Sequence, residues 1–157
     1  MKQKWKSLLI CLLLPVAAGA LSALLSREGM GNFSQLNQPP LSPPAWLFPV
    51  VWTALYLMMG LASWQVLRSG KPSGAVQNAL QWYAAQLAVN FFWSIIFFRL
   101  ELYLTAFLWL CLLWVLILVT LFRFRRIRAS AGWLLLPYLI WVTFAGYLNL
   151  GIWLLNR

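Results

Sequence analysis

The apolar residues of this chain lie in five long runs, and these runs constrain its fold more than any other feature. A helix that crosses the hydrocarbon core of a bilayer needs about 20 mostly apolar residues. The runs cover approximately Ser7–Leu25, Ala45–Leu67, Val76–Phe98, Leu102–Phe122 and Ala131–Leu154. This pattern predicts an all-α integral membrane protein, in which residues 1–157 form a single domain built as a bundle of five transmembrane helices.

The composition excludes an ordinary soluble domain. Hydrophobic residues make up 63% of the chain and charged residues only 9%, whereas a soluble domain typically carries about 25% charged residues. A net charge of +10 would suggest nucleic-acid binding in a soluble protein. Here the basic residues fall between apolar runs, which indicates membrane topology instead. We therefore expect membrane lipid around the chain and no nucleic acid.

The first run has two possible interpretations. A basic start, an apolar stretch and several small residues are also typical of a secretory signal peptide. The apolar stretch extends from about Leu8 to Leu25, however, and is long enough to span a membrane. We interpret it as a retained first helix and keep a signal peptide as the alternative.

The basic residues predict the orientation. With five spans, nine of them lie on the side of the N-terminus, namely Lys2, Lys4, Lys6, Arg68, Lys71, Arg123, Arg125, Arg126 and Arg128. Only three, Arg27, Arg99 and Arg157, lie on the other side. Lysine and arginine are in excess in cytoplasmic loops. The pattern therefore predicts a cytoplasmic N-terminus, with the C-terminus and the long loop at 26–44 outside.

The residues needed for conventional catalysis are missing. The chain has no histidine and no aspartate, and its only acids are Glu28 and Glu101. Metal sites require clusters of histidine, cysteine or carboxylate, and acid–base or serine–histidine catalysis requires similar groups. Cys11 and Cys111 lie deep inside apolar runs, which makes a disulfide framework unexpected. We expect no metal, no cofactor and no conventional catalytic residues.

Three of the runs carry amides and tryptophans on shared helix faces. A polar amide inside a span is costly unless it is paired, so it should face the bundle interior together with neighbours three or four positions away. These inward residues are Trp52 and Tyr56, then Gln86, Asn90 and Trp93, and finally Pro137, Trp141, Ala145 and Asn149. Together they predict a pocket for a flat apolar ligand. Helix–helix contacts through Asn90 and Asn149 are the alternative, and anchoring at the membrane interface explains other tryptophans.

The loop before the second run is rich in proline, and its end reads "PPLSPPAWLFPVVW" from Pro39 to Trp52. Proline restrains its own backbone and that of the preceding residue, so folding such a loop over a pocket costs little entropy. A helix start alone explains Pro44 but does not explain Pro39, Pro40 and the length of the loop. We expect this loop to form the lid and rim of the pocket.

Three segments combine prolines, tryptophans and asparagines at fixed spacing: "QPPLSPPAWLFPVVWTALYLMMGLA", "NFFWSIIFF" and "PYLIWVTFAGYLNLGIWLLN". They resemble a known family, the translocator protein family, also called TspO/MBR or the peripheral-type benzodiazepine receptor family. The resemblance, which covers essentially the whole chain, implies a five-helix bundle, commonly a homodimer, here in a bacterial cytoplasmic membrane. It also implies binding of porphyrins such as protoporphyrin IX, of isoquinoline carboxamides and of benzodiazepines. Carried onto this chain, the pocket would use Pro43, Trp52, Asn90, Trp93, Trp141 and Ala145.

The resemblance leads to a first hypothesis, a porphyrin-binding membrane protein that acts as a tetrapyrrole sensor, carrier or regulator. The alternative is light-dependent oxidative degradation of protoporphyrin IX, with Trp52 and Trp141 as the photochemical residues, because an excited porphyrin can oxidise a stacked indole. A third possibility is a passive transporter or assembly factor that binds nothing specific.

Two further expectations concern partners. Sterol-binding members of the family carry a tyrosine-to-arginine motif at the end of the last helix, and here its positions hold Leu150, Gly151 and Leu154. This broken motif argues against sterol binding. Ala84 and Ala88 provide the small-xxx-small spacing of a helix–helix contact, which predicts a homodimer through the third helix. A similar pair, at residues 19 and 23, lies on the first helix.

Overall fold

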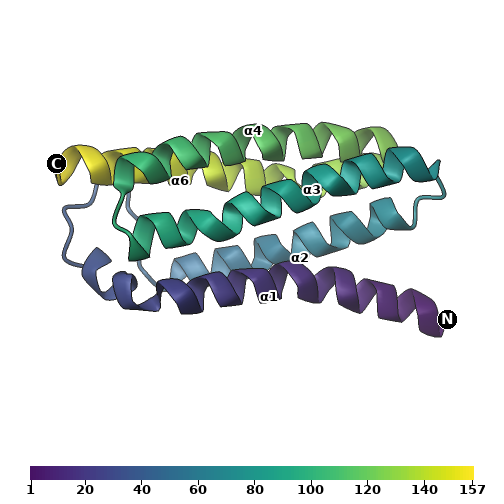
Figure 1. The fold of residues 1–157 in the computed structure, drawn as a ribbon, viewed down its shortest axis with the longest axis horizontal. Coiled ribbons are helices and arrows are strands. Elements are labelled where there is room, and N and C mark those ends of the chain that lie inside the picture. The colour runs from purple at the N-terminus through teal and green to yellow at the C-terminus, as the bar shows by residue number, and fades with distance from the viewer.

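The computed structural model describes residues 1–157 as an elongated bundle of helices, in which each long helix runs antiparallel to the one before it (Figure 1). The elements are α1 (Lys2–Phe33), α2 (Leu47–Leu67), α3 (Ser73–Ser94), the π-helical turn η1 (Ile95–Arg99), α4 (Tyr103–Ile127), α5 (Ala129–Leu134) and α6 (Leu136–Leu155). No β-strand is present. The expected all-α fold is confirmed.

Four segments are long and apolar enough to cross a membrane: Lys2–Phe33, Leu47–Leu67, Tyr103–Ile127 and Ala129–Leu155. We expected five such segments, and four satisfy both conditions. Helix α3 has the length but not the apolarity, because it carries the amides of Gln77, Asn78, Gln81, Gln86 and Asn90. It is nevertheless one of the long helices of the bundle and packs alongside α4 (Figure 1).

The outside of the bundle is apolar. Only 32 of the 157 residues are buried, so most of the hydrophobic side chains lie on the surface. Leu9, Ile10 and Leu13 of α1, for example, are each more than half exposed. A surface of this kind is stable against lipid and aggregates in water. The buried core is formed by side chains such as Met59 and Leu113, which are fully enclosed.

Helix α1 is longer than the sequence suggests. It was expected to end near Leu25, but it continues to Phe33, so the connection to α2 covers 34–46 instead of 26–44. The extra turns pack against the connection between α3 and α4. Gly29 lies against the carbonyl of Phe98, where a Cβ atom would collide. The Asn32 amide donates a hydrogen bond of 2.9 Å to a carboxylate oxygen of Glu101.

The fifth apolar run is interrupted near its start. The short helix α5 ends at Leu134, and α6 begins at Leu136 with Pro137 in its first turn. Proline is well tolerated at that position because the first turn of a helix leaves its N–H groups unbonded. The interruption lets α6 run the length of the bundle while α5 packs beside α4.

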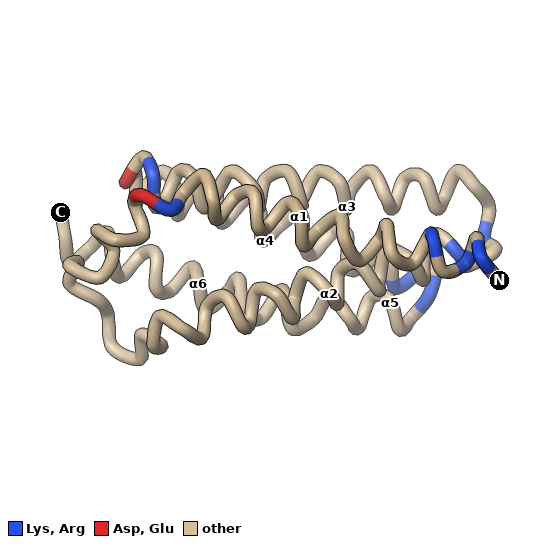
Figure 2. The backbone as a smooth tube through the Cα atoms, turned by 90° about the horizontal axis from the view of Figure 1, so that it is seen from below, with Lys and Arg blue, Asp and Glu red and all other residues tan.

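Charge is distributed unequally between the two ends of the bundle (Figure 2). The N-terminus and the basic connections at 68–71 and 123–128 lie at one end, which we call the basic end. Both acidic residues, Glu28 and Glu101, lie toward the opposite end, where the proline-rich loop and the C-terminus are also found. We call this opposite end the loop end.

Candidate functional site

Trp52 of α2 lies at the centre of an aromatic cluster in the loop-end half of the bundle. Its ring stacks on Tyr56, one turn further along α2, with 5.6 Å between the ring centroids. It also lies 6.4 Å from the ring of Trp93 on α3 and meets Tyr138 of α6 edge-on at 6.2 Å. Three helices thus contribute rings to one group, as the shared inward faces of α2 and α3 predicted.

A chain of hydrogen bonds lies directly beneath these rings. The Tyr56 hydroxyl donates to Asn90 Oδ1 at 3.1 Å, and Asn90 Nδ2 donates to the Tyr138 hydroxyl at 2.6 Å. That hydroxyl in turn donates to Gln86 Oε1 at 2.7 Å. Asn90, Tyr138 and Gln86 are each less than 5% exposed. Because buried polar groups are stable only when they are paired, this chain fixes α2, α3 and α6 relative to one another.

A second polar connection supports Trp93. Its indole N–H donates to Asn149 Oδ1 on α6 at 3.2 Å, and Asn149 Nδ2 donates to the Tyr103 carbonyl at the start of α4 at 2.8 Å. Asn90 and Asn149 therefore do join helices, as the alternative interpretation of these two residues held. They also hold the side chains that surround Trp52, so the two interpretations are compatible.

Trp141 belongs to a neighbouring aromatic group. Its ring contacts Phe48 of α2 edge-on at 5.9 Å and Phe144 of α6 at 5.7 Å, and it does not stack on Trp52. Its indole N–H is buried and has no hydrogen-bond partner. A buried donor without a partner is costly, so this N–H is available to an acceptor on a ligand. Ala145, one turn further along α6, is buried.

The proline-rich loop is attached to the far end of α6. Asn156 accepts a hydrogen bond from the Asn37 backbone N–H at 3.0 Å and donates one to the Asn37 carbonyl at 2.9 Å. The Tyr147 hydroxyl donates to the Pro40 carbonyl at 2.8 Å. Pro39 is buried against Gly151, where a Cβ atom would approach the proline ring to 2.7 Å.

The loop thereby crosses the loop end of the bundle from α1 to α6 before it enters α2 (Figure 1). Pro43 lies in this loop and is half-buried. Helix α6 holds the loop and also carries Trp141, Ala145 and Asn149. The loop and the aromatic region consequently share one supporting helix.

Most of the predicted site residues thus gather in one region, but the inward face of α6 differs from the prediction. Tyr138 was not expected at the site, although it contacts Trp52 and joins the hydrogen-bond chain. Pro137, which was expected to point inward, is exposed. The spacing of Tyr138, Val142, Ala145 and Asn149 follows the 3.6-residue period of a helix and would have identified the buried face.

Comparison with known proteins gives consistent matches over the whole chain. The model of the TspO/MBR family matches residues 11–154. The chain is 38% identical to the tryptophan-rich protein TspO of Chlorobaculum tepidum, in an alignment that covers 99% of each chain. It is 36% identical to the tryptophan-rich sensory protein of Cereibacter sphaeroides, over 99% of this chain and 95% of the relative. It is 35% identical to the translocator protein of Bos taurus, over 92% of this chain and 87% of the relative.

Proposed function

The chain belongs to the TspO/MBR family, and on that premise we propose that it is a membrane-embedded sensor, carrier or regulator that binds porphyrins such as protoporphyrin IX. The observation that carries the proposal is the group of aromatic rings packed around Trp52, in the loop-end half of the bundle. Side chains of this kind offer large apolar faces to a flat ligand. The name of the Cereibacter relative, a tryptophan-rich sensory protein, agrees with a sensory role.

The free donor of Trp141 supports the same proposal. Porphyrins with carboxylate side chains bring strong acceptors together with a large apolar ring. A carboxylate or carbonyl oxygen of the ligand would give the buried indole N–H the partner that the protein does not supply. Hydrogen bonds to charged groups contribute more than those to neutral groups. The donor would therefore orient the ligand, while the rings of Trp52 and Trp93 provide the apolar contact.

The loop supports a closed site. Its attachment to α6 at Asn37 and Pro40 keeps it over the end of the bundle, and its prolines limit the entropy lost on closing. Entry of a ligand from this end requires those attachments to open. We accordingly assign the loop at 34–46 the role of a lid, and we assign the loop end to the outside of a bacterial cytoplasmic membrane.

Absorbance spectroscopy tests the proposal. Titration of the purified protein with protoporphyrin IX in the dark should shift the Soret band and reach saturation. Trp52→Phe keeps most of the ring area but changes the stacking. We therefore expect the affinity to fall by tenfold at most, which corresponds to ~1.4 kcal/mol of binding free energy. Trp133→Phe is the matched control, because Trp133 is exposed at the basic end, on α5. An unshifted Soret band would refute porphyrin binding, and equal losses in both variants would place binding elsewhere.

The closeness of Trp52 to Trp93 and Tyr138 favours one alternative, light-dependent oxidation of bound protoporphyrin. In that case an indole gives an electron to the excited porphyrin, dissolved dioxygen takes that electron from the reduced porphyrin, and dioxygen and the superoxide so formed are the oxidants that attack the macrocycle. Neighbouring aromatic side chains share the oxidised state of the indole. Illumination of the saturated complex should then remove the Soret band and create a product band. Trp52→Phe or Trp141→Phe should slow this loss far more than it weakens binding. Equal, small losses in both readouts would indicate a binding protein whose photobleaching is incidental.

A further inference from the structure

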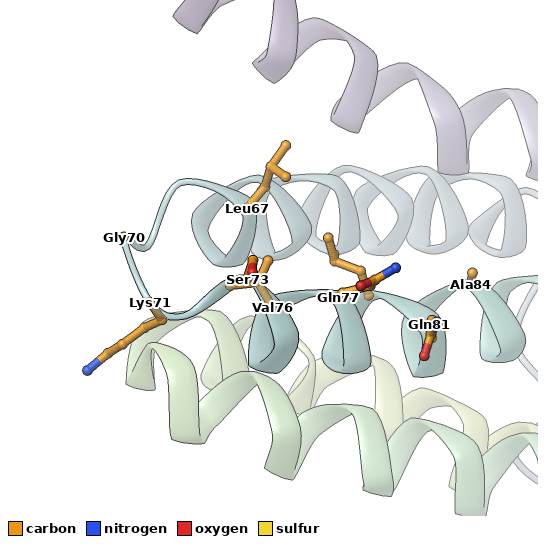
Figure 3. Close-up of a pocket in the computed structure, with 9 residues that line it drawn as sticks. Leu67, Gly70, Lys71, Ser73, Val76, Gln77, Gln81 and Ala84 are labelled. Atoms are coloured by element: carbon orange, nitrogen blue, oxygen red, sulfur yellow. The ribbon is translucent and has the colours of Figure 1, made fainter.

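A cavity of about 660 Å³ opens between α2 and α3 at the basic end, away from the aromatic cluster (Figure 3). It exists because α1 approaches α3 closely only in the loop-end half. There Ser22 donates to the Phe91 carbonyl, and Ser94 donates to Ser26. Toward the N-terminus α1 and α3 diverge (Figure 1). The α2–α3 hairpin is left uncovered on that side.

The cavity has an apolar wall with the length of one membrane leaflet. Val76, Leu80 and Ala84 lie four residues apart and share one face of α3, and Leu67 of α2 adds to the wall. Eight residues of helix rise by about 12 Å, and one leaflet of a ~30 Å hydrocarbon core is about 15 Å deep. The wall therefore runs along most of the depth of one leaflet, where the acyl chain of a lipid lies.

The opening of the cavity is polar. Lys71 lies at its mouth with the ammonium group directed outward (Figure 3). Gln77 and Gln81 also line the cavity, are exposed, and donate to no residue of the chain. By contrast, Gln86 donates to the Met59 sulfur and accepts from the Tyr138 hydroxyl within the bundle. Amides without partners are costly near the hydrocarbon core, and the ester and phosphate oxygens of a phospholipid are suitable acceptors.

The charge around the mouth selects the class of lipid. Arg68 and Lys71 lie in the connection between α2 and α3. Neither acidic residue lies at this end of the molecule (Figure 2). The first turn of α3 begins beside the mouth, and the partial positive charge of a helix N-terminus has the same sign as Lys71. An anionic headgroup gains from this potential, whereas a zwitterionic headgroup gains much less.

We propose that this cavity binds one anionic phospholipid, with an acyl chain along Val76, Leu80 and Ala84 and the headgroup at Lys71. The amide of Gln77, in the second turn of α3, contacts the glycerol and ester region, and the amide of Gln81 lies one turn deeper. The lipid fills the space that α1 leaves open and ties the α2–α3 hairpin to the leaflet at the basic end.

Native mass spectrometry of the full-length protein tests this inference. The protein is equilibrated with mixed micelles that contain phosphatidylglycerol and phosphatidylcholine with identical acyl chains, and the lipid that it retains is counted. The wild type should retain one phosphatidylglycerol in preference to phosphatidylcholine. Lys71→Gln should lower this preference by about fivefold, the ratio that the attraction of one lysine gives. Lys2→Gln, a basic position at the same end that does not line the cavity, should change it little.

A pair of substitutions on α3 separates a lipid from a second copy of the chain. Ala84→Phe fills the cavity and should abolish retention, whereas Ala88→Phe, one turn further along the same exposed face, should preserve it. Loss of lipid in both variants together with loss of a dimer would mean that a second copy closes the cavity. Equal retention of the two lipids by the wild type, or displacement of the lipid by soluble glycerol phosphate, would also overturn the proposal.

Discussion

Removal of the Tyr138 hydroxyl is the most informative single change in the bundle. Tyr138→Phe keeps the ring that contacts Trp52 but deletes one acceptor and one donor, at 2.6 Å from Asn90 and 2.7 Å from Gln86. Interhelical hydrogen bonds in membrane proteins contribute about 0.6 kcal/mol each on average and at most ~1.7. Buried groups left unpaired cost about 1–3 kcal/mol. We expect the free energy of unfolding to fall by about 1–3 kcal/mol.

The assay is reversible unfolding in mixed micelles as the mole fraction of a denaturing detergent rises, followed by far-ultraviolet circular dichroism. Tyr147→Phe is the matched control, because it removes a tyrosine hydroxyl bonded to the loop from a side chain that is 44% exposed. Changes at such positions usually stay within about 0.5 kcal/mol. An unfolding midpoint of Tyr138→Phe equal to that of the wild type would refute the argument.

A double substitution tests the cause. Gln86→Leu alone leaves the Tyr138 hydroxyl without its acceptor, and Tyr138→Phe alone leaves the Gln86 carbonyl without its donor. In the double variant neither member of the Tyr138–Gln86 pair is left unpaired, and removing both partners of a pair is often nearly neutral. The Asn90 amide lacks its acceptor in Tyr138→Phe and in the double variant alike. The double variant should therefore be more stable than the sum of the two single losses predicts. Strict additivity would show that the two side chains are not coupled.

The remaining predictions concern the loop and the assembly. Asn156→Ala removes both hydrogen bonds to Asn37, so amide hydrogen exchange in the loop at 34–46 should accelerate by about tenfold or more while the helices keep their protection; an unchanged loop would show that other contacts hold it. Leucine at both Ala84 and Ala88, which are exposed on α3, should prevent close helix contact and yield monomers in mild detergent. A dimer that persists in size-exclusion chromatography with light scattering would place the interface on another helix.

The sequence predicted the helical class and the inward orientation of several amides and aromatic residues, because the amides inside the apolar runs had few possible orientations. Asn90 and Asn149 are buried, and Trp52, Tyr56 and Trp93 surround them as expected. The face of α6 was misplaced because successive steps of four residues drift by about 40° each around a 3.6-residue helix. The interval from Pro137 to Asn149 accumulates three such steps.

Other features depend on contacts that no local pattern reveals. The residues at 26–33 look like the start of a loop, yet they stay helical because Gly29 and Asn32 pack against the α3–α4 connection. The Asn156–Asn37 pair joins positions that are 119 residues apart. Which of the other two tryptophans lies beside Trp52 was also unpredictable, since the choice between Trp93 and Trp141 depends on the packing of three helices.

The position of the ligand can be measured directly through the indole N–H groups. In protein labelled with ¹⁵N at the tryptophan indole, each N–H gives one resonance, which is assigned by Trp→Phe substitution. Protoporphyrin IX should shift the resonance of Trp141, whose N–H is buried and unpartnered, and that of Trp52. The resonance of Trp64, which donates to Ser7 at the basic end with 3.2 Å between donor and acceptor, should stay in place. A shift at Trp64 without a shift at Trp141 would contradict binding at the aromatic cluster.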